Sequence, residues 1–284
     1  MLTAGKIQTL HLARFSDNGA YLMDEEMNEV LLPNRYVTEQ MEEGDSIEVF
    51  IYHDSEDRLV ASTEYPFAVV GDIAALEVVG TTPYGAFLDW GLPKDLFLPR
   101  ANQLHKVASG DVCIVALYTD NVTGRIVATE KLNKFVSNDE ITVVPGEEVK
   151  IIVARRNDNG YRVVVNGRHW GMIYFNQIFK EIEIGDTLTG FIQKITEDKR
   201  IDISLQRPGY DGVKESAGKL ISLMERQGGV LALCDNSSPE EISEHTQMSK
   251  KVFKRAVGYL LKTGSIEQQD GYIALRPGYR KEKP

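Results

Sequence analysis

Four basic side chains lie close together near the carboxyl end of the sequence, at Lys250, Lys251, Lys254 and Arg255. In a helix, positions i, i+1, i+4 and i+5 share one face. The apolar residues of this segment then form a stripe on the other face, namely Val252, Phe253, Ala256, Val257, Leu260 and Leu261. Cationic groups near a helix N-terminus favour phosphate, and a single arginine among lysines indicates sequence-tolerant binding. The alternative is an ordinary solvated lysine face.

Residues suited to catalysis or to metal binding are not grouped in the sequence. The five histidines lie away from one another and from both cysteines at the spacings of metal sites; they are His11, His53, His105, His169 and His245. No GxxxxGK[ST], GxSxG or kinase motif is present. Acidic runs such as Asp24-Glu25-Glu26 are typical of solvated loops. We therefore expect a protein that is not an enzyme and that uses no metal and no cofactor.

Length and composition indicate a folded protein of more than one domain. The chain has 284 residues, of which 42% are hydrophobic and 26% charged. No apolar run reaches the roughly 18–20 residues of a membrane span, and the N-terminus has no secretory pattern. Cys113 and Cys234 form no CxxC motif, which suits a reducing compartment. These features predict a cytoplasmic protein without a membrane partner.

The net charge of −10 is concentrated at the N-terminus. Residues 1–64 carry 14 acidic and 4 basic side chains, and residues 65–140 have a net charge of −3. Residues 141–207 and 208–284 have net charges of +1 and +2. A polyanion is repelled by the first segment and tolerated by the last two, so we expect the main nucleic-acid surface in the C-terminal half.

Glycine spacing shows that one unit occurs three times. Each repeat has three glycines, of which the second follows the first by 14 residues and the third follows the second by 25. They are Gly5, Gly19 and Gly44 in the first repeat, Gly71, Gly85 and Gly110 in the second, and Gly146, Gly160 and Gly185 in the third. In the second repeat, runs rich in β-branched and aromatic residues predict strands, and they are 72–79, 86–90, 96–99, 112–118 and 125–129. Five short strands in about 60 residues favour a closed barrel, because closure removes exposed edges.

The motifs of the second repeat resemble the ribosomal S1-type RNA-binding domain, an OB-fold barrel. They are Val-Gly-Asp-Ile, Tyr84-Gly-Ala-Phe-Leu-Asp, Ser109-Gly-Asp-Val and Gly124-Arg-Ile-Val-Ala. The resemblance extends over residues 1–64, 65–132 and 145–206. It implies that single-stranded RNA is held by two aromatics, a histidine and the arginine of the last strand, with stacking contributing about 1–3 kcal/mol per base.

No repeat keeps the whole S1 set of contact residues. The second repeat has Tyr84, Phe87 and Arg125, with Pro99 and Arg100 in place of the histidine. The first has only Tyr21 and Arg58. The third has Arg162, Tyr174 and Arg200, and it adds Arg155, Arg156, Trp170 and Lys194. Because arginine both stacks on bases and pairs with phosphate, we rank the third repeat above the second. The alternative for Trp90, Trp170 and Tyr174 is a core or barrel-mouth position.

The sequence after residue 207 changes to helical periodicity. An amphipathic segment over 214–226 is followed by a capping box from Ser238 to Glu241, and a further helix begins near Ser249. A hairpin turning at Asp270-Gly271 completes a pattern similar to a winged helix-turn-helix. We therefore expect a mainly β, multidomain chain of three S1-like OB-fold barrels (1–64, 65–140 and 141–207) and an α+β winged helix (208–284).

The order of these domains resembles the bacterial conserved virulence factor B family. That resemblance implies an RNA-binding regulator of gene expression, and we expect single-stranded RNA as its partner. One alternative is a scaffold whose acidic first barrel binds a basic protein. Another is a DNA-binding transcription regulator that works through the winged helix, and a third is a hydrolase.

Overall fold

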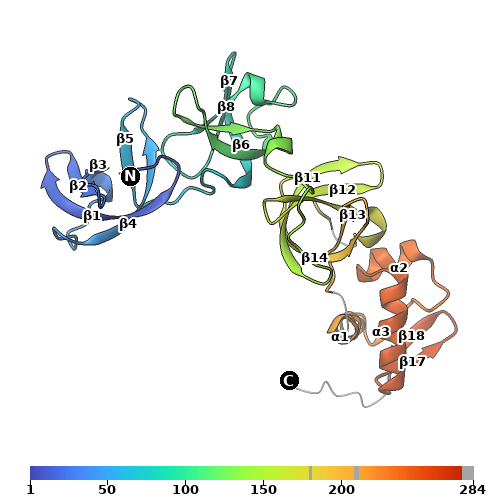
Figure 1. The fold of residues 1–284 in the computed structure, drawn as a ribbon. Helices are drawn as coiled ribbons and strands as arrows, with labels where there is room; N and C mark the ends of the chain where they lie inside the picture. The colour runs from blue at the N-terminus through green and yellow to red at the C-terminus, as the bar shows by residue number, and fades with distance from the viewer. Residues whose placement is uncertain (179–180, 208–210, 277–284) are drawn as a thin grey trace. The chain divides into compact units, whose positions relative to one another are not determined.

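The computed structural model describes residues 1–178, 181–207 and 211–276 (Figure 1). It contains three closed five-stranded barrels followed by a winged helix, as the sequence predicts. Each barrel has the same neighbour order, in which the fifth strand lies between the third and the fourth. The orders are β1-β2-β3-β5-β4, β6-β7-β8-β10-β9 and β11-β12-β13-β15-β14. We call these barrel 1, barrel 2 and barrel 3.

The strands of barrel 2 lie close to the five runs predicted in the second repeat, and barrels 1 and 3 have the same set of five strands. In barrel 1 they are β1 (Ile7–Ser16), β2 (Gly19–Met23), β3 (Glu29–Pro33), β4 (Ser46–His53) and β5 (Leu59–Ser62). In barrel 2 they are β6 (Ile73–Thr82), β7 (Gly85–Leu88), β8 (Leu96–Pro99), β9 (Val112–Thr119) and β10 (Ile126–Thr129). In barrel 3 they are β11 (Glu148–Asn157), β12 (Gly160–Val165), β13 (His169–Tyr174), β14 (Thr187–Ile195) and β15 (Ile201–Ser204).

The second glycine of each repeat is required by close packing between neighbouring strands. Gly19, Gly85 and Gly160 each begin the second strand of a barrel. A Cβ atom at any of them would overlap a backbone carbonyl oxygen of the third strand, which belongs to Leu32, Leu98 or Ile173. Only glycine lacks that atom, which explains why the spacing survives in all three repeats.

Barrels 1 and 2 share part of one hydrophobic core. Strand β4 is buried on both faces: Val49 and Ile51 pack inside barrel 1, whereas Phe50 and Tyr52 pack with the core residues of barrel 2. The Phe50 and Trp90 rings meet edge to face, with centroids 5.6 Å apart. Residues 1–137, with 184–186, accordingly form one compact unit, and the remaining described residues form a second.

The winged helix comprises three helices and a three-stranded sheet. Its elements are α1 (Asp211–Arg226), β16 (Val230–Leu231), α2 (Pro239–Thr246), α3 (Lys250–Lys262), β17 (Ile266–Gln269) and β18 (Tyr272–Leu275). The predicted capping box at Ser238 and Glu241 is present, and Ser249 caps α3 through a bond from the Val252 amide. The apolar stripe of α3 packs with α1 and β18 in one core.

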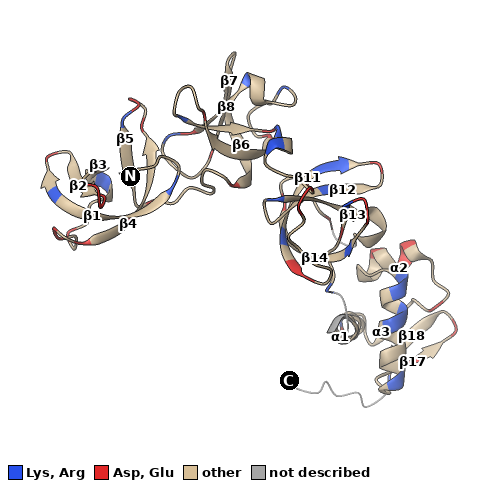
Figure 2. Ribbon diagram, viewed as in Figure 1, with Lys and Arg blue, Asp and Glu red and all other residues tan. Residues whose placement is uncertain are grey.

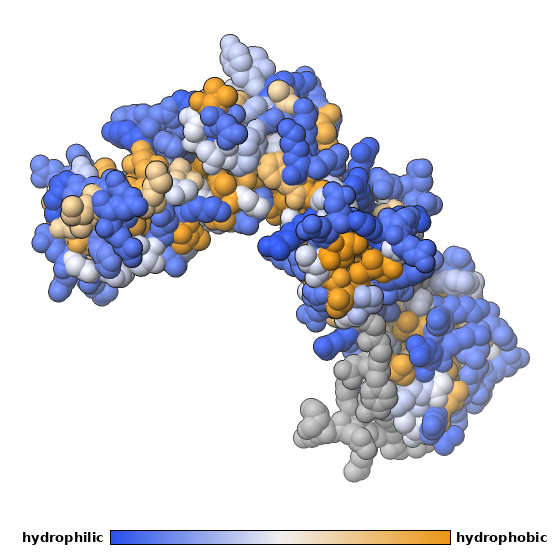
Figure 3. Space-filling model, viewed as in Figure 1, coloured by the Kyte–Doolittle hydropathy of each residue, from blue (hydrophilic) through white to orange (hydrophobic). Residues whose placement is uncertain are grey.

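Some short elements are not evident from the sequence pattern. Strand β16 has only two residues, and a 3₁₀ turn follows the third strand of each barrel at Asn34–Tyr36, Arg100–Asn102 and Phe175–Gln177. None of the helices in the described ranges is both long and apolar enough to span a membrane. The face seen in Figure 3 is mostly hydrophilic, with separate patches of hydrophobic residues.

Candidate nucleic-acid interface

Barrel 3 presents a stacked arginine and tryptophan on its outer surface. Alternation along β12 and β13 turns Val163, Val165 and Ile173 inward and leaves Arg162 and Trp170 half-buried on the outer face. The Arg162 guanidinium carbon lies 3.7 Å from the centroid of the Trp170 ring system. The pair therefore combines two flat groups, one of them cationic, that are both partly exposed on the outer face of the barrel.

A second arginine adds positive charge beside this pair. Arg155 of β11 is the register partner of Arg162, directly after a β-bulge in β11. Burial, and then the charge of Arg155, lower the pKa of Arg162, although a guanidinium stays protonated at neutral pH. Within the ranges that the structure describes, neither arginine forms an ion pair. We call Arg155, Arg162 and Trp170 the barrel 3 platform.

Barrel 1 also has an arginine stacked on an aromatic ring, but this arginine is paired with a carboxylate. The Arg14 guanidinium carbon lies 3.8 Å from the Tyr21 ring centroid, and these residues pair in register between β1 and β2 as Arg155 and Arg162 do in barrel 3. Arg14, however, also forms an ion pair with Glu29 at 2.6 Å. A stacked arginine thus occurs in both barrels, between β1 and β2 in barrel 1 and between β12 and β13 in barrel 3, and within the described ranges only the arginine of barrel 1 forms an ion pair.

The other predicted residues of barrel 3 do not join the platform as one group. Arg156 follows Arg155 in β11 and therefore projects to the opposite face, where its guanidinium carbon lies 5.2 Å from the Phe175 ring centroid. The Tyr174 hydroxyl donates to Asp202 Oδ1 at 3.1 Å; burial, and then that carboxylate, raise the pKa of Tyr174. Lys194 of β14 is exposed, and its register partner is Asp202 of β15.

In every barrel, the arginine directly before the fifth strand forms an ion pair with a carboxylate. Arg58 pairs with Asp54 and Glu56, at 2.7 and 2.8 Å, and Arg200 pairs with Asp198 at 2.7 Å. Arg125 of barrel 2 pairs with Asp57 of barrel 1. These contacts reduce the attraction of the three arginines for phosphate, whereas Arg155 and Arg162 form no ion pair in the described ranges.

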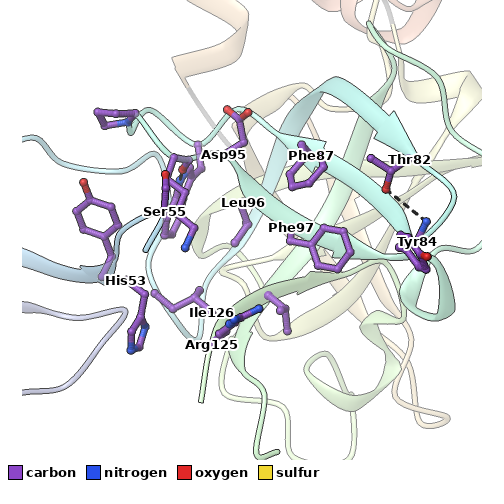
Figure 4. Close-up of a pocket in the computed structure, with 15 residues that line it drawn as sticks. His53, Ser55, Thr82, Tyr84, Phe87, Asp95, Leu96, Phe97, Arg125 and Ile126 are labelled. Carbon is purple, nitrogen blue, oxygen red and sulfur yellow. Dashed lines mark hydrogen bonds between the residues drawn. The ribbon is translucent and has the colours of Figure 1, made fainter. Parts of the chain in front are cut away.

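The predicted aromatic residues of barrel 2 line a cavity of about 580 Å³ (Figure 4). Tyr84, Phe87 and Arg125 all contribute to its wall, whereas Arg100 does not and instead donates to Gln103 at 2.9 Å. Tyr84 is 81% exposed at its edge, and Trp90 is 3% exposed, as a core residue would be. Phe97 of β8, which the sequence pattern did not single out, packs against Phe87.

Helix α3 of the winged helix carries the predicted basic face. Lys251, Lys254 and Arg255 are exposed, and Lys250 is half-buried near Glu241 of α2. Basic residues recur along the α3 ribbon in Figure 2. The first turn of α3 contains no acidic residue, so the positive end of the helix dipole is not compensated there. Sequence reasoning missed Lys262, which is also exposed and extends the face by two turns.

Comparisons with known proteins agree with these observations. Residues 4–64 match the S1 domain, and residues 218–275 match the CvfB-like winged helix domain. The chain is 30% identical to the uncharacterized protein YitL of Bacillus subtilis, over 94% of this chain and 92% of YitL. It is 26% identical to conserved virulence factor B of Staphylococcus aureus (strain USA300), over 84% and 81% of the two chains.

One similar solved structure is a multidomain protein with nucleic acid binding domains from Streptococcus pneumoniae TIGR4. It aligns over 96% of this chain and 98% of its own, with 22% identity and a TM-score of 0.45. The domain matches and the near full-length similarity to YitL are consistent with the repeats and the winged helix described above. The chain belongs to the conserved virulence factor B family.

Proposed function

We propose that this protein is an RNA-binding regulator that holds single-stranded RNA with barrel 3 and the winged helix and so affects gene expression after transcription. The observation that carries the proposal is the barrel 3 platform. Arg162 is stacked on Trp170, and Arg155 stands beside it without an acidic partner in the described chain. Unstacked bases pack on such flat groups, and unpaired guanidinium groups bind the adjacent phosphates.

The winged helix supplies a second cationic surface. Lys251, Lys254 and Arg255 share one exposed face of α3, and the S1 and winged-helix domains lie on one chain. Two weak sites on one chain gain affinity when a single RNA strand reaches both. The staphylococcal relatives are named conserved virulence factor B, and we propose that this protein acts in the bacterial cytoplasm.

A direct binding experiment tests this proposal. Fluorescence anisotropy is measured for the full chain with single-stranded RNA, duplex RNA and duplex DNA over a series of salt concentrations. We expect single-stranded RNA to bind most tightly, and Trp170→Ala or Arg162→Ala to weaken it. Lys106→Ala serves as the control, because Lys106 is an exposed barrel 2 lysine outside both sites. Preference for duplex DNA, or unchanged RNA binding in both platform variants, would refute the proposal.

A second candidate function is supported by the charge of barrel 1. Its segment carries 14 acidic and 4 basic side chains, which suits a basic protein partner and not a polyanion. Deletion of residues 1–64 is a poor test, because Phe50 and Tyr52 belong to the core of barrel 2. A pull-down with the full chain, after nuclease treatment, tests this function better. A partner protein that the wild type captures and the double variant Glu42→Gln/Glu43→Gln does not would favour the scaffold function.

A further inference from the structure

The segment that leads into barrel 3, residues 138–143, is tied to strand β13 at two points. Asn138 bonds to the main chain of Trp170, and Thr142 Oγ1 lies 2.8 Å from Nε2 of His169, which is buried. The hydrophobic side chains of the segment pack with the core of barrel 3, and they are Ile141 and Val143. We call residues 138–143 the barrel 3 strap; it lies in the same compact unit as barrel 3.

The side-chain amide of Asn138 takes the place of a strand residue beside Trp170. Its Oδ1 accepts from the Trp170 amide at 2.7 Å, and its Nδ2 donates to the Trp170 carbonyl oxygen at 2.9 Å. Strand β15 does not supply these bonds, because its register with β13 begins only at Gly171 and Ile201. A carboxamide carries the same donor and acceptor as a peptide group, so Asn138 pairs two backbone groups that β15 leaves over.

The same amide also ties β13 to the turn before β15. Asn138 Nδ2 donates to the Lys199 carbonyl oxygen at 2.8 Å. Lys199 in turn donates from Nζ to the carbonyl oxygen of Asp139, the next residue of the strap, at 2.7 Å. Asn138 therefore makes one accepted and two donated bonds, a set that an aspartate, which donates none when ionised, cannot supply.

These bonds hold the residue whose ring belongs to the barrel 3 platform. The Trp170 ring lies 3.7 Å from the guanidinium carbon of Arg162, and a strand residue directs its side chain through the orientation of its own backbone. On its other side Trp170 is the register partner of Val164 in β12. The N–H and C=O of one strand residue point to the same side, so the main-chain bonds of Trp170 go to the strap and not to β12.

We propose that Asn138 is a positioning residue of the barrel 3 platform, which fixes the main chain of Trp170 and so keeps the indole stacked with Arg162. The proposal rests on the proposed function and adds to it a residue from outside the strands of the barrel. Asn138 acts through Trp170 and not by touching RNA. Sequence spacing gives no sign of this role, since Asn138 lies 32 residues before Trp170.

The position of Trp170 is tested first, in the absence of RNA. The full chain has two tryptophans, Trp90 and Trp170, so isotope-labelled tryptophan gives two amide and two indole signals in NMR spectra, which Trp170→Phe assigns. Asn138→Ala should shift both signals of Trp170 and speed the hydrogen exchange of its amide by roughly tenfold, because that amide loses its acceptor. The signals of Trp90 should stay in place. Unchanged Trp170 signals would overturn the proposal.

The effect on binding is measured by fluorescence anisotropy with single-stranded RNA. Asn138→Ala should weaken binding by roughly tenfold through impaired stacking, and the salt slope should stay the same because no cation is removed. If Asn138 acts through the indole, Asn138→Ala should cause no further loss when it is added to Trp170→Ala. Losses that add up in the double variant would show that Asn138 acts by another route, and the positioning role would be lost.

Matched variants separate positioning from stability. Ile192→Ala removes buried atoms from the barrel 3 core, so it should lower the free energy of unfolding and leave RNA affinity unchanged at a temperature where the variant is folded. Asn138→Ser keeps a hydroxyl at the site, should show smaller changes than Asn138→Ala, and replaces it if the alanine variant does not fold. An equal loss of affinity in Ile192→Ala would contradict the proposal. If the wild type binds no RNA, the proposed function fails, whereas the NMR signals still decide whether Asn138 positions Trp170.

Discussion

The basic face of α3 makes a quantitative prediction about salt dependence. Replacing Lys251, Lys254 and Arg255 together by alanine removes three exposed cations that form no ion pair in the described structure. For single strands, each phosphate contact contributes about 0.7 to the slope of log affinity against log salt. Three lost contacts therefore make the slope shallower by about 2.

The same arithmetic gives the loss of affinity. Between 1 M and 0.1 M salt, a slope difference of about 2 corresponds to roughly 100-fold weaker binding, or about 3 kcal/mol. At 1 M salt the triple variant and the wild type should bind almost equally. Alanine is a strong helix former and the three side chains lie outside the buried stripe, so the melting temperature should change little.

The assay is fluorescence anisotropy with one single-stranded RNA at five or more salt concentrations. Lys106→Ala controls for the general effect of removing a surface cation, and it should shift the slope by much less than the triple variant. Parallel lines for the wild type and the triple variant would refute the reasoning, because they would mean that α3 contacts no phosphate. A loss that persists unchanged at 1 M salt would point to altered folding instead of lost charge.

Three further predictions concern the barrels. Trp170→Ala should reduce the free energy of RNA binding by about 1–3 kcal/mol through lost stacking. Tyr21→Ala should reduce it by much less, because Arg14 beside Tyr21 is paired with Glu29. The same anisotropy assay compares the two losses. Gly160→Ala should destabilise the protein by about 3 kcal/mol or more in urea unfolding, since its Cβ would overlap the Ile173 carbonyl oxygen. Burial raises the pKa of Tyr36 to about 12, so the unfolded chain ionises first and the free energy of unfolding should fall as pH rises from 10 to 12. Tyr36→Phe should make that fall smaller, because Tyr174 and Cys113 also have raised pKa values and still contribute; an unchanged fall would assign the whole effect to such other groups.

The three barrels and the winged helix could be predicted because their signals lie within short stretches of sequence. The middle glycine of each repeat is fixed by backbone packing, and the capping box at Ser238 and Glu241 acts within one helical turn. The family and the fold class predicted from these patterns are confirmed. The domain limits 1–64, 65–140, 141–207 and 208–284 and the choice of site residues stay predictions.

The arrangement of the site depends on contacts that sequence spacing does not reveal. Arg155 and Arg156 are neighbours in sequence, yet strand alternation sends them to different faces of β11. Arg125 and Asp57 are 68 residues apart and meet only because two barrels pack together. One signal for that packing was present: four successive apolar residues from Val49 to Tyr52 are typical of a strand buried on both faces.

Because β4 is buried on both faces, the first two repeats are not two independent domains. Modules joined by linkers normally fold, melt and evolve one at a time. Here Phe50 and Tyr52 fill space beneath the neighbouring barrel, so neither of the first two copies is complete without the other. The first copy therefore supplies part of the core of the second, and we expect a core substitution at Phe50 or Tyr52 to lower the stability of both barrels.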